Sequence, residues 1–595
     1  MTVERNGAEI ITEYLVREGV PYAVGLCGHG DIGLLDALFD RQSEIATISV
    51  HHESVAGFIA DAYHRVRHQP LATVTSCGPG SANLPIALGS AMMDDSAFLA
   101  ITGNVATSQF NRGPFQETGR FHQADFPAVV RPYVKRSFQA TRAEQLPLML
   151  RQAFALMRQG RPGPVHLDVP LDVFAERTAA EIPDASLWSR GGVGRSGASA
   201  EDLREIVDLI ARAERPVLVA GSGVENDEAS EVLQRVASLL RIPIATTPLG
   251  KSGVDSRLPV SLGATGRNGT YPANRATRTA DLVVALGTRF DDRATSSWLD
   301  GYTYSFPKAD LVHVHVDPAE IGRNYPATVG VAASPRVVLE QIEAAFRAAD
   351  ARVPDNSAWL DQVASWKAEW EAHVAPRRRS DAVPIRPERA LSELRGALPD
   401  DAILLSDVGV HHNWIVQEWA ATGSRTVLQS WGFASMGFGV AGVIGAHLAA
   451  PDRPTVAVVG DGGFLMMPSV VATAVQYDVP AVWVIWNNGG FISIRDQQTA
   501  YFGAGRELAT SFVHAASRQP YSADFVAMAR SMGGEGIRVE QPGELGSAVE
   551  AAIASGRPTV VDAVVDGAVG LPSAATWQLP PKPYPEPSFG WPDPQ

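Results

Sequence analysis

The fold of this chain is decided by Gly460-Asp461-Gly462-Gly463-Phe464 and by Val482-Trp483-Val484-Ile485-Trp486-Asn487-Asn488, the two ends of residues 460–488. An apolar strand at 455–459 precedes the first of them, and residues 468–477 suit an amphipathic helix. The pattern therefore predicts a β-α-β unit with one acid and one amide at its strand ends. Open α/β sheets bind ligands at the carboxyl ends of their strands.

Asp461 and Asn488 both offer hard oxygen atoms. Such a pair suits Mg²⁺, which takes few protein ligands and fills its shell with water and phosphate oxygens. The glycines beside Asp461 let the backbone approach a diphosphate, and a helix that starts there favours an anion. The stretch thus predicts a site for magnesium and a diphosphate.

The composition indicates a large enzyme in a reducing compartment. A chain of 595 residues is too long for a single core, and we expect about three domains. A net charge of −15 argues against a nucleic-acid partner. Two cysteines, Cys27 and Cys77, provide no disulfide framework. No apolar run is long enough to span a bilayer, so we expect a cytoplasmic protein without a membrane partner.

Strands and helices alternate along the chain, which predicts an α/β fold of three doubly wound parallel-sheet domains. We place an N-terminal domain at 1–185, a central Rossmann-like domain at 195–345 and a C-terminal domain at 375–570. A Gly-, Ser- and Arg-rich break at 189–199 separates the first two domains. Residues 571–595 form a Pro-rich tail.

Three N-terminal motifs resemble the pyrimidine-binding domain of thiamine-diphosphate enzymes. They are a strand that ends in Gly28-His29-Gly30, His51-His52-Glu53 at a helix start, and the loop 75–83. The spacing from Asp461 to Asn488 (488 − 461 = 27) fits the same family. The pattern is most similar to that of the acetohydroxyacid (acetolactate) synthases. This resemblance spans nearly the whole chain, through Phe115-Gln116-Glu117, Arg293, residues 317–322 and Met436-Gly437-Phe438-Gly439.

The resemblance implies four catalytic residues. Glu53 would hydrogen-bond the pyrimidine N1′ and so promote loss of the thiazolium C2 proton. Gln116 would reach the reacting carbonyl oxygen from the partner subunit, and Arg293 would hold the carboxylate of the second oxo acid. His29 is a departure, because the synthases usually have Gly at this position. An imidazole there can move protons near neutral pH.

The resemblance also implies the cofactor contacts. Mg²⁺ would bind Asp461, Asn488 and the backbone of Gly490, and Met436 would be the apolar wedge under the thiazolium. The central domain would hold FAD, although related enzymes bind ADP or nothing there. Its contacts would be Gly221, Gly223, Gly263, Asp291 and Asp317. The remaining thiamine-diphosphate contacts would be Pro79, Asn83, Gly409, His411, His412, Ala434, Gly462, Gly463 and Met466.

The implied activity is that of a thiamine-diphosphate- and Mg²⁺-dependent carboligase or decarboxylase of 2-oxo acids. As a transferase or lyase it would form an acyloin-type product through an enamine, in a homodimer or homotetramer with active sites at the subunit interface. Gln497 stands where the synthases have a Trp that shapes the second-substrate pocket, and the segment 262–270 also departs from them. Both differences argue that the acceptor is not the usual branched-chain precursor.

Two alternatives remain open. His29 and Lys251 resemble the ring-opening 1,2-dione hydrolases, which predicts a hydrolase that opens a cyclic dione. The other alternative is an inactive homologue with a regulatory role. The presence of Glu53, Asp461 and Asn488 argues against inactivity.

Overall fold

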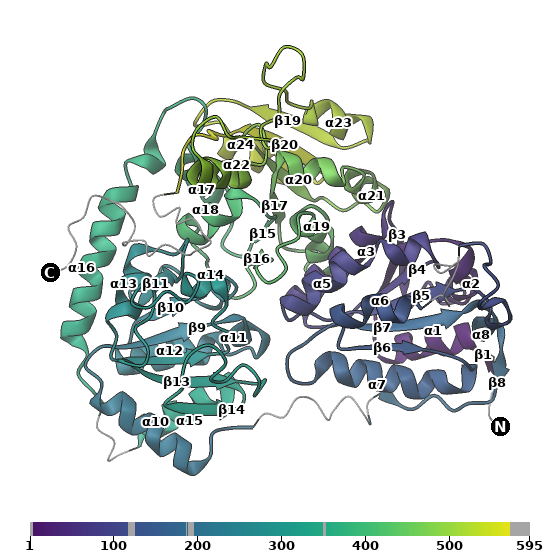
Figure 1. The fold of residues 1–595 in the computed structure, drawn as a ribbon, viewed down its shortest axis with the longest axis horizontal. Helices are drawn as coiled ribbons and strands as arrows, with labels where there is room; N and C mark the ends of the chain where they lie inside the picture. Colours follow the sequence, from purple (N-terminus) through teal and green to yellow (C-terminus); the bar gives the residue numbers. More distant parts are fainter. Residues whose placement is uncertain (1–3, 117–124, 186, 188–195, 349–352, 572–595) are drawn as a thin grey trace.

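The computed structural model describes residues 4–116, 125–185, 187, 196–348 and 353–571. Figure 1 shows three lobes, which follow one another along the chain. Each lobe contains one six-stranded sheet, and every strand pairing within these sheets is parallel. The predicted fold class is therefore confirmed. The tail beyond Leu571 and residues 188–195 of the predicted linker lie outside the described residues.

The N-terminal sheet has the strand order β3-β2-β4-β5-β7-β6. A short antiparallel pair, β1 (Arg5–Asn6) with β8 (Arg177–Thr178), joins the two ends of this domain. The sheet strands are β2 (Tyr22–Leu26), β3 (Ala46–Ser49), β4 (Ala72–Thr75), β5 (Leu99–Asn104), β6 (Arg136–Gln139) and β7 (Val165–Pro170). The helices are α1 (Gly7–Arg17), α2 (Ile32–Phe39), α3 (Glu53–Arg67), α4 (Pro79–Ala82), α5 (Pro85–Met93), α6 (Phe126–Val130), α7 (Leu146–Arg158) and α8 (Leu171–Ala175).

The central sheet has the order β11-β10-β9-β12-β13-β14. Counted within this domain, the order is 3-2-1-4-5-6, which is that of the dinucleotide-binding fold and agrees with the Rossmann-like prediction. The strands are β9 (Pro216–Ala220), β10 (Ile244–Thr246), β11 (Ser261–Ala264), β12 (Leu282–Leu286), β13 (Asp310–His315) and β14 (Val329–Ala332). The helices are α10 (Ala200–Arg212), α11 (Ser222–Asn226), α12 (Ser230–Leu240), α13 (Tyr271–Thr279), α14 (Asp292–Thr295), α15 (Pro335–Arg347) and the connector α16 (Ser357–Val374).

The C-terminal sheet has the order β16-β15-β17-β18-β20-β19. Counted within their own domains, the N- and C-terminal sheets share the order 2-1-3-4-6-5. The strands are β15 (Ile403–Ser406), β16 (Val427–Gln429), β17 (Thr455–Gly460), β18 (Val482–Asn487), β19 (Glu535–Val539) and β20 (Thr559–Val564). The helices are α17 (Pro387–Ala397), α18 (Val410–Glu418), α19 (Phe438–Ala449), α20 (Asp461–Met466), α21 (Val470–Gln476), α22 (Ile492–Phe502), α23 (Phe525–Ser531) and α24 (Leu545–Ser555).

The strands at the centres of the sheets are mostly apolar because helices cover both faces. Every residue of β18 is buried, and in β17 only the terminal Gly460 is partly exposed. A strand that is buried on both faces cannot place an acid in its middle at low cost. Asp461 and Asn488 follow strand ends, whereas Asp168 inside β7 and Asp562 inside β20 are buried acids held by hydrogen bonds.

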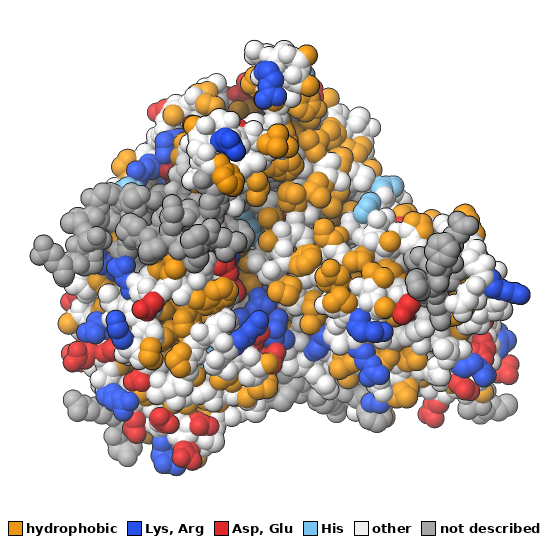
Figure 2. All heavy atoms as spheres, in the orientation of Figure 1, with side chains coloured by type: hydrophobic (Ala, Val, Ile, Leu, Met, Phe, Trp, Pro, Cys, Tyr) orange, Lys and Arg blue, Asp and Glu red, His pale blue; other side chains and the backbone are white. Residues whose placement is uncertain are grey.

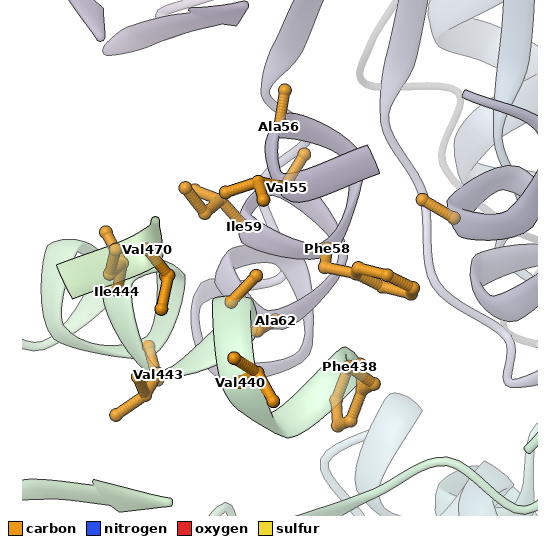
Figure 3. Packing of buried hydrophobic residues seen from close by; sticks show 14 of the residues in the cluster. Val55, Ala56, Phe58, Ile59, Ala62, Phe438, Val440, Val443, Ile444 and Val470 are labelled. Atoms are coloured by element: carbon orange, nitrogen blue, oxygen red, sulfur yellow. The ribbon is translucent and has the colours of Figure 1, made fainter. Parts of the chain in front are cut away.

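One helix pair joins the N- and C-terminal domains into a single core. Helix α3 crosses α19, and Figure 3 shows their apolar side chains packed against each other. Gly445 lets the backbones meet, because a Cβ on it would lie 2.0 Å from the carbonyl oxygen of Ile59. No helix of the described segments is long and apolar enough to cross a membrane.

Candidate functional site

A cavity of about 760 Å³ lies between the three lobes. The carboxyl ends of β17 and β18 form its floor, and loops after β12 and β13 form part of its wall. The predicted site residues that line it come from both the central and the C-terminal domain: Asp291, Arg293, Gly409, His411, His412, Ala434, Met436, Asp461, Gly462, Gly463, Asn488 and Gly490.

Asp461 is positioned by the chain that returns from β18. Its Oδ2 accepts hydrogen bonds from the amides of Gly489 (2.8 Å) and Gly490 (3.1 Å), and its Oδ1 accepts one from Gly462 (2.7 Å). Burial raises the pKa of Asp461 to about 6 despite these bonds. A cation beside the carboxylate would offset that burial. Together with Asn488 on the same wall, Asp461 fits the oxygen-rich, sparsely liganded site that Mg²⁺ takes.

His411 fits the diphosphate end of the cavity. It lies in the first turn of α18, where the helix start favours an anion. Its ring is buried beside Gly409, whose Cβ, if present, would lie 2.7 Å from it. Its Nε2 atom has no hydrogen-bond partner among the described residues. A phosphate oxygen would supply the partner that this buried nitrogen lacks.

Asp407 binds the backbone of the loop that carries Met436. This carboxylate is fully buried, and its Oδ1 accepts from the amides of Gly437 (2.8 Å) and Gly439 (3.0 Å) at the start of α19. Burial raises the pKa of Asp407 to about 7. The contact fixes the backbone directly after Met436, which lines the cavity.

Glu53 belongs to a second group of predicted residues, in the N-terminal domain. It is the first residue of α3, and its Oε2 accepts a hydrogen bond from Asn83 Nδ2 at 2.9 Å. Gly80 lies beside its other oxygen, at 3.4 Å from the position of an added Cβ. Pro79 and Asn83 are both exposed in the single chain, whereas Glu53 is buried.

His29 and Gln116 lie in the same group and meet around a thiol. The Sγ of Cys77 is 3.9 Å from His29 Nδ1 and 4.0 Å from Gln116 Oε1. Phe115 packs edge-on against His29, and Gln116 has a positive φ of 63°. Glu117, which completes the predicted motif, lies outside the described residues.

The two groups are separate within one chain. Of the described residues that line the large cavity, Met93 and Arg161 come from the N-terminal domain, whereas Glu53, His29 and Gln116 are not among them. A single chain therefore presents a cavity with the predicted diphosphate and magnesium residues, and elsewhere a surface with the predicted pyrimidine residues.

Some predicted contacts are not on the large cavity. Met466 is 51% exposed and does not line it. Asp317 lines a smaller cavity of about 250 Å³, and its Oδ1 accepts from the amide of Ala319. Lys251 is buried, where its Nζ donates to the carbonyl of Val416 at 2.9 Å.

The residues predicted for FAD lie in several loops of the central domain, where Asp291 lines the large cavity and Asp317 the smaller one. Gly221 and Gly223 face the backbone of Gly287, at 2.2 and 2.6 Å from the positions of added Cβ atoms. Gly263 faces Thr270 in the same way, and none of these glycines lines either cavity. The missing side chains therefore serve close contacts between loops, and the flavin contacts stay a prediction.

Several lining residues are not predicted from sequence. Figure 2 shows Lys and Arg side chains near the centre of the face where the lobes meet. Arg161 reaches the cavity from a loop before β7, with Asp95 at 2.7 Å and Glu320 at 2.9 Å. No periodic or motif signal marks such residues, because domain docking brings them there. The others are Met93, Trp298, Arg289, Arg323, Trp431 and Phe433.

Comparison with known proteins agrees with this geometry. Three family models match: "Thiamine pyrophosphate enzyme, N-terminal TPP binding domain" at residues 5–125, the central domain at 203–342 and the C-terminal TPP binding domain at 407–563. These models cover most of the chain.

Curated relatives match over nearly the full length. A "Probable acetolactate synthase large subunit" of Methanocaldococcus jannaschii is 34% identical, over 95% of this chain and 93% of that protein. The acetolactate synthase large subunit of Parasynechococcus marenigrum is 32% identical, over 94% of this chain and 87% of that protein. The acetolactate synthase isozyme 3 large subunit of Escherichia coli is 29% identical, over 94% of this chain and 95% of that protein. From these matches and the three domain models, the chain belongs to the thiamine pyrophosphate enzymes, in the acetolactate synthase-like family.

Proposed function

We propose that this protein is a thiamine-diphosphate- and Mg²⁺-dependent carboligase or decarboxylase of 2-oxo acids that forms an acyloin-type product. The observation that carries the proposal is the convergence of Asp461, Asn488, His411 and Arg293 on one cavity. Asp461 and Asn488 offer oxygen ligands for a metal, and His411 offers a donor for a diphosphate. Arg293 lines the same cavity with a guanidinium, which suits a carboxylate.

Each group has a distinct task in this reaction. Thiamine diphosphate, when bound, supplies the nucleophilic carbon and the electron sink for decarboxylation. Asp461, Asn488 and the Gly490 carbonyl would hold Mg²⁺. Glu53 would hold a proton at the pyrimidine N1′, kept in position by Asn83. FAD binding by the central domain stays a prediction, and none of the steps above requires it.

We infer a homodimer as the smallest active unit. Glu53 and the large cavity are separate within one chain, so a second copy must bring its Glu53 group to the cavity if both serve one cofactor. Figure 2 shows a broad band of hydrophobic side chains across the N- and C-terminal lobes. Large apolar side chains that stay exposed in the single chain include Phe115, Phe433 and Met466. These features support an interface.

The direct test follows ¹³C-pyruvate by NMR with thiamine diphosphate and Mg²⁺ present. We expect labelled CO₂ and an acyloin. The rate should fall at least about a hundredfold in Glu53→Gln, whereas thiamine-diphosphate binding by calorimetry changes little. Glu201→Gln, at the start of α10 on the surface, is the matched control. Absence of CO₂ from a cofactor-loaded wild-type enzyme would exclude pyruvate as the donor.

A mixing experiment tests the shared site. Glu53→Gln and Asp461→Asn proteins are each expected to be inactive, and they are dissociated, mixed and reassembled. A hybrid dimer has one site with both native residues, so random pairing restores about one quarter of wild-type activity. Two sites that each lie within one chain would give no recovery.

The ring-opening hydrolase remains a second candidate because His29 lies against Cys77, near Gln116. Lys251 no longer favours it, since this lysine is buried against Val416 and lines neither cavity. Cyclohexane-1,2-dione offered to the loaded enzyme distinguishes the two reactions. Ring opening that His29→Gly abolishes, without CO₂ release from pyruvate, would favour the hydrolase.

A further inference from the structure

Trp298 presents a half-exposed indole to the large cavity. The side chain lines this cavity and is 45% exposed. Its Nε1 donates to the carbonyl oxygen of Phe290 at 2.8 Å, and Asn324 Nδ2 donates to the same oxygen at 3.0 Å. Phe290 is buried, and its ring lies edge-on to the rings of Tyr304 and Tyr325. The polar edge of the indole is therefore anchored to the core of the central domain.

The backbone that carries Trp298 is strained. Ser296, Ser297 and Trp298 have φ angles of 54°, 57° and 56°, so three consecutive residues with a Cβ adopt the left-handed region. The amide of Ser297 donates to the carbonyl of Asp292 at 2.9 Å, and the Ser296 hydroxyl shares a hydrogen bond of 2.8 Å with that of Thr303. Strained backbone that its surroundings hold in place is commonest at ligand sites. The turn therefore points to a ligand for the ring that it carries.

Residues 262–270, whose sequence departs from the synthases, support the same turn. Within this segment, Arg267 Nη2 donates to the hydroxyl of Ser297. The amide of Arg267 also donates to the carbonyl of Arg293 at 3.2 Å, in the short helix α14 that leads to Trp298. The departure in sequence and the aromatic ring on the cavity wall thus belong to one substructure. This connection favours a role for Trp298 in the choice of acceptor.

The other large aromatic side chains that line the cavity already contact a ring of the protein. Trp431 stacks on His412 with ring centroids 3.7 Å apart, whereas Phe433 and Phe491 each lie edge-on to a neighbouring ring. Among the residues that the structure describes, no ring or cation packs on the indole of Trp298. An open indole face favours a second ring, in an offset-stacked or edge-on arrangement. A flat aromatic group therefore fits this position better than a flexible aliphatic chain.

Trp298 and the predicted metal ligands lie on different parts of the cavity. Asp461 and Asn488 follow β17 and β18 on the floor, whereas Trp298 follows α14 in the central domain. A cavity of about 760 Å³ is within the size range of sites that enclose a whole organic ligand. A ring at Trp298 therefore belongs to a reactant that lies against the central domain.

We propose that the acceptor is a carbonyl compound that carries an aromatic ring, and that Trp298 binds this ring. The ring packs on the indole, and the hydrogen bond to Phe290 and the left-handed turn fix the indole plane. Trp298 is thus a specificity-determining residue of the acceptor site. An aryl aldehyde and an aryl-substituted 2-oxo acid share this chemistry. The inference rests on the proposed carboligase function.

The first experiment compares acceptors in pairs that differ in the ring. Wild type and Trp298→Ala are loaded with thiamine diphosphate and Mg²⁺ and given ¹³C-pyruvate as the donor. Benzaldehyde is paired with propanal, and phenylpyruvate with 2-oxobutyrate. We expect wild type to use the aromatic member of at least one pair about tenfold better, measured as kcat/KM. Trp298→Ala should remove about that tenfold preference and leave kcat/KM for the aliphatic member within about twofold, because it loses one aromatic contact.

Two further variants separate the ring contact from other effects. Trp298→Phe keeps an aromatic ring and should retain most of the preference. Phe39→Ala removes another exposed aromatic side chain, in α2 outside the cavity, and should leave the rates unchanged. Donor decarboxylation, followed with ferricyanide as the oxidant, should be the same in every variant, because the donor does not contact Trp298.

The second experiment needs no turnover. The loaded enzyme is titrated calorimetrically with benzyl alcohol, 3-phenylpropanoate and butanoate, which carry the ring without a carboxylate, both groups, and the carboxylate without a ring. Trp298→Ala should weaken the binding of both ring-bearing ligands about tenfold and leave butanoate unchanged. Tighter binding of 3-phenylpropanoate than of benzyl alcohol would identify the acceptor as an oxo acid, and the reverse order would identify it as an aldehyde.

Four results would overturn the inference. They are a wild type that does not prefer the aromatic member of either pair, equal losses for aromatic and aliphatic acceptors in Trp298→Ala, a lower affinity for FAD as its only effect, and a weaker dimer in sedimentation as its only effect. The last two would show that a flavin or the second copy covers the indole. Failure of the proposed function is a different result, namely no CO₂ from the loaded wild type.

Discussion

Gly445→Ala is expected to destabilise the contact between α3 and α19, although alanine favours helices. A Cβ at this position would lie 2.0 Å from the Ile59 carbonyl oxygen and 2.8 Å from its carbon. Both atoms are backbone, so the helices must move apart by roughly 1 Å before the contact is tolerable. Overpacking of this kind costs about 1–3 kcal/mol, against about 1 kcal/mol that alanine gains over glycine in a helix. The net loss should therefore be at most about 2 kcal/mol.

Two other glycines provide matched controls. Gly442 lies on the same helix, and an added Cβ would meet the side chains of Ala62 at 3.0 Å and Leu405 at 3.1 Å. Side chains can shift, so Gly442→Ala should be close to neutral. Gly396 in α17 has nothing within 4 Å of an added Cβ, so alanine there should stabilise by about 0.5–1 kcal/mol.

The assay is urea unfolding of the three variants, with tryptophan fluorescence and far-UV circular dichroism as independent probes. Two probes are needed because a chain of three domains need not unfold in one step. We expect Gly396→Ala to be the most stable protein and Gly445→Ala the least stable. Gly442→Ala should be about as stable as the wild type. If Gly445→Ala is as stable as Gly442→Ala, then the close approach of the two backbones does not limit the packing.

Three further predictions concern the metal, the domain contact and the acid stability. Asp461→Asn removes the anionic ligand, and calorimetry should show magnesium-dependent cofactor affinity falling by at least about tenfold. Asp95→Ala removes the buried carboxylate shared by Arg161 (2.7 Å) and Arg289 (3.7 Å), although Arg161 keeps Glu320 at 2.9 Å, so it should cost about 3 kcal/mol in urea unfolding, the lower end of the range for a broken buried pair, unlike exposed Asp40→Ala. Burial lowers the pKa of His166 to about 3, so the unfolded chain binds an extra proton between pH 6.5 and 3 and stability falls as the pH drops through that range. His166→Gln should remove up to about 1.4 kcal/mol per pH unit of that slope, measured by unfolding at pH 7 and 5.

The three sheets could be predicted from the sequence because their strands are short apolar runs that end in Gly or polar residues. Val482–Asn487 is an example, since all of its residues are buried and only the last of them, Asn487, carries a polar amide side chain. The order of strands within each sheet could not be predicted in the same way. Periodicity reports which face is buried and does not report which neighbour lies beside it.

The floor of the large cavity was predictable because Asp461 and Asn488 follow adjacent parallel strands, whose carboxyl ends meet at one edge. Arg161 and Trp431 were missed for a different reason. Arg161 lies in the loop before β7, where Asp95 of its own domain and Glu320 of the central domain hold it at the cavity. Trp431 lies in an irregular loop, where no periodic pattern shows the direction of a side chain.

The α3–α19 crossing links the two groups of site residues within each chain. Helix α3 begins at Glu53, and α19 begins two residues after Met436. Because these groups would serve different cavities in a homodimer, the crossing connects one active site to the other. A change in the separation of the two helices would therefore move Glu53 in one site and Met436 in the other. Gly445→Ala should for this reason lower activity more than its stability loss explains, even under conditions in which the protein remains folded.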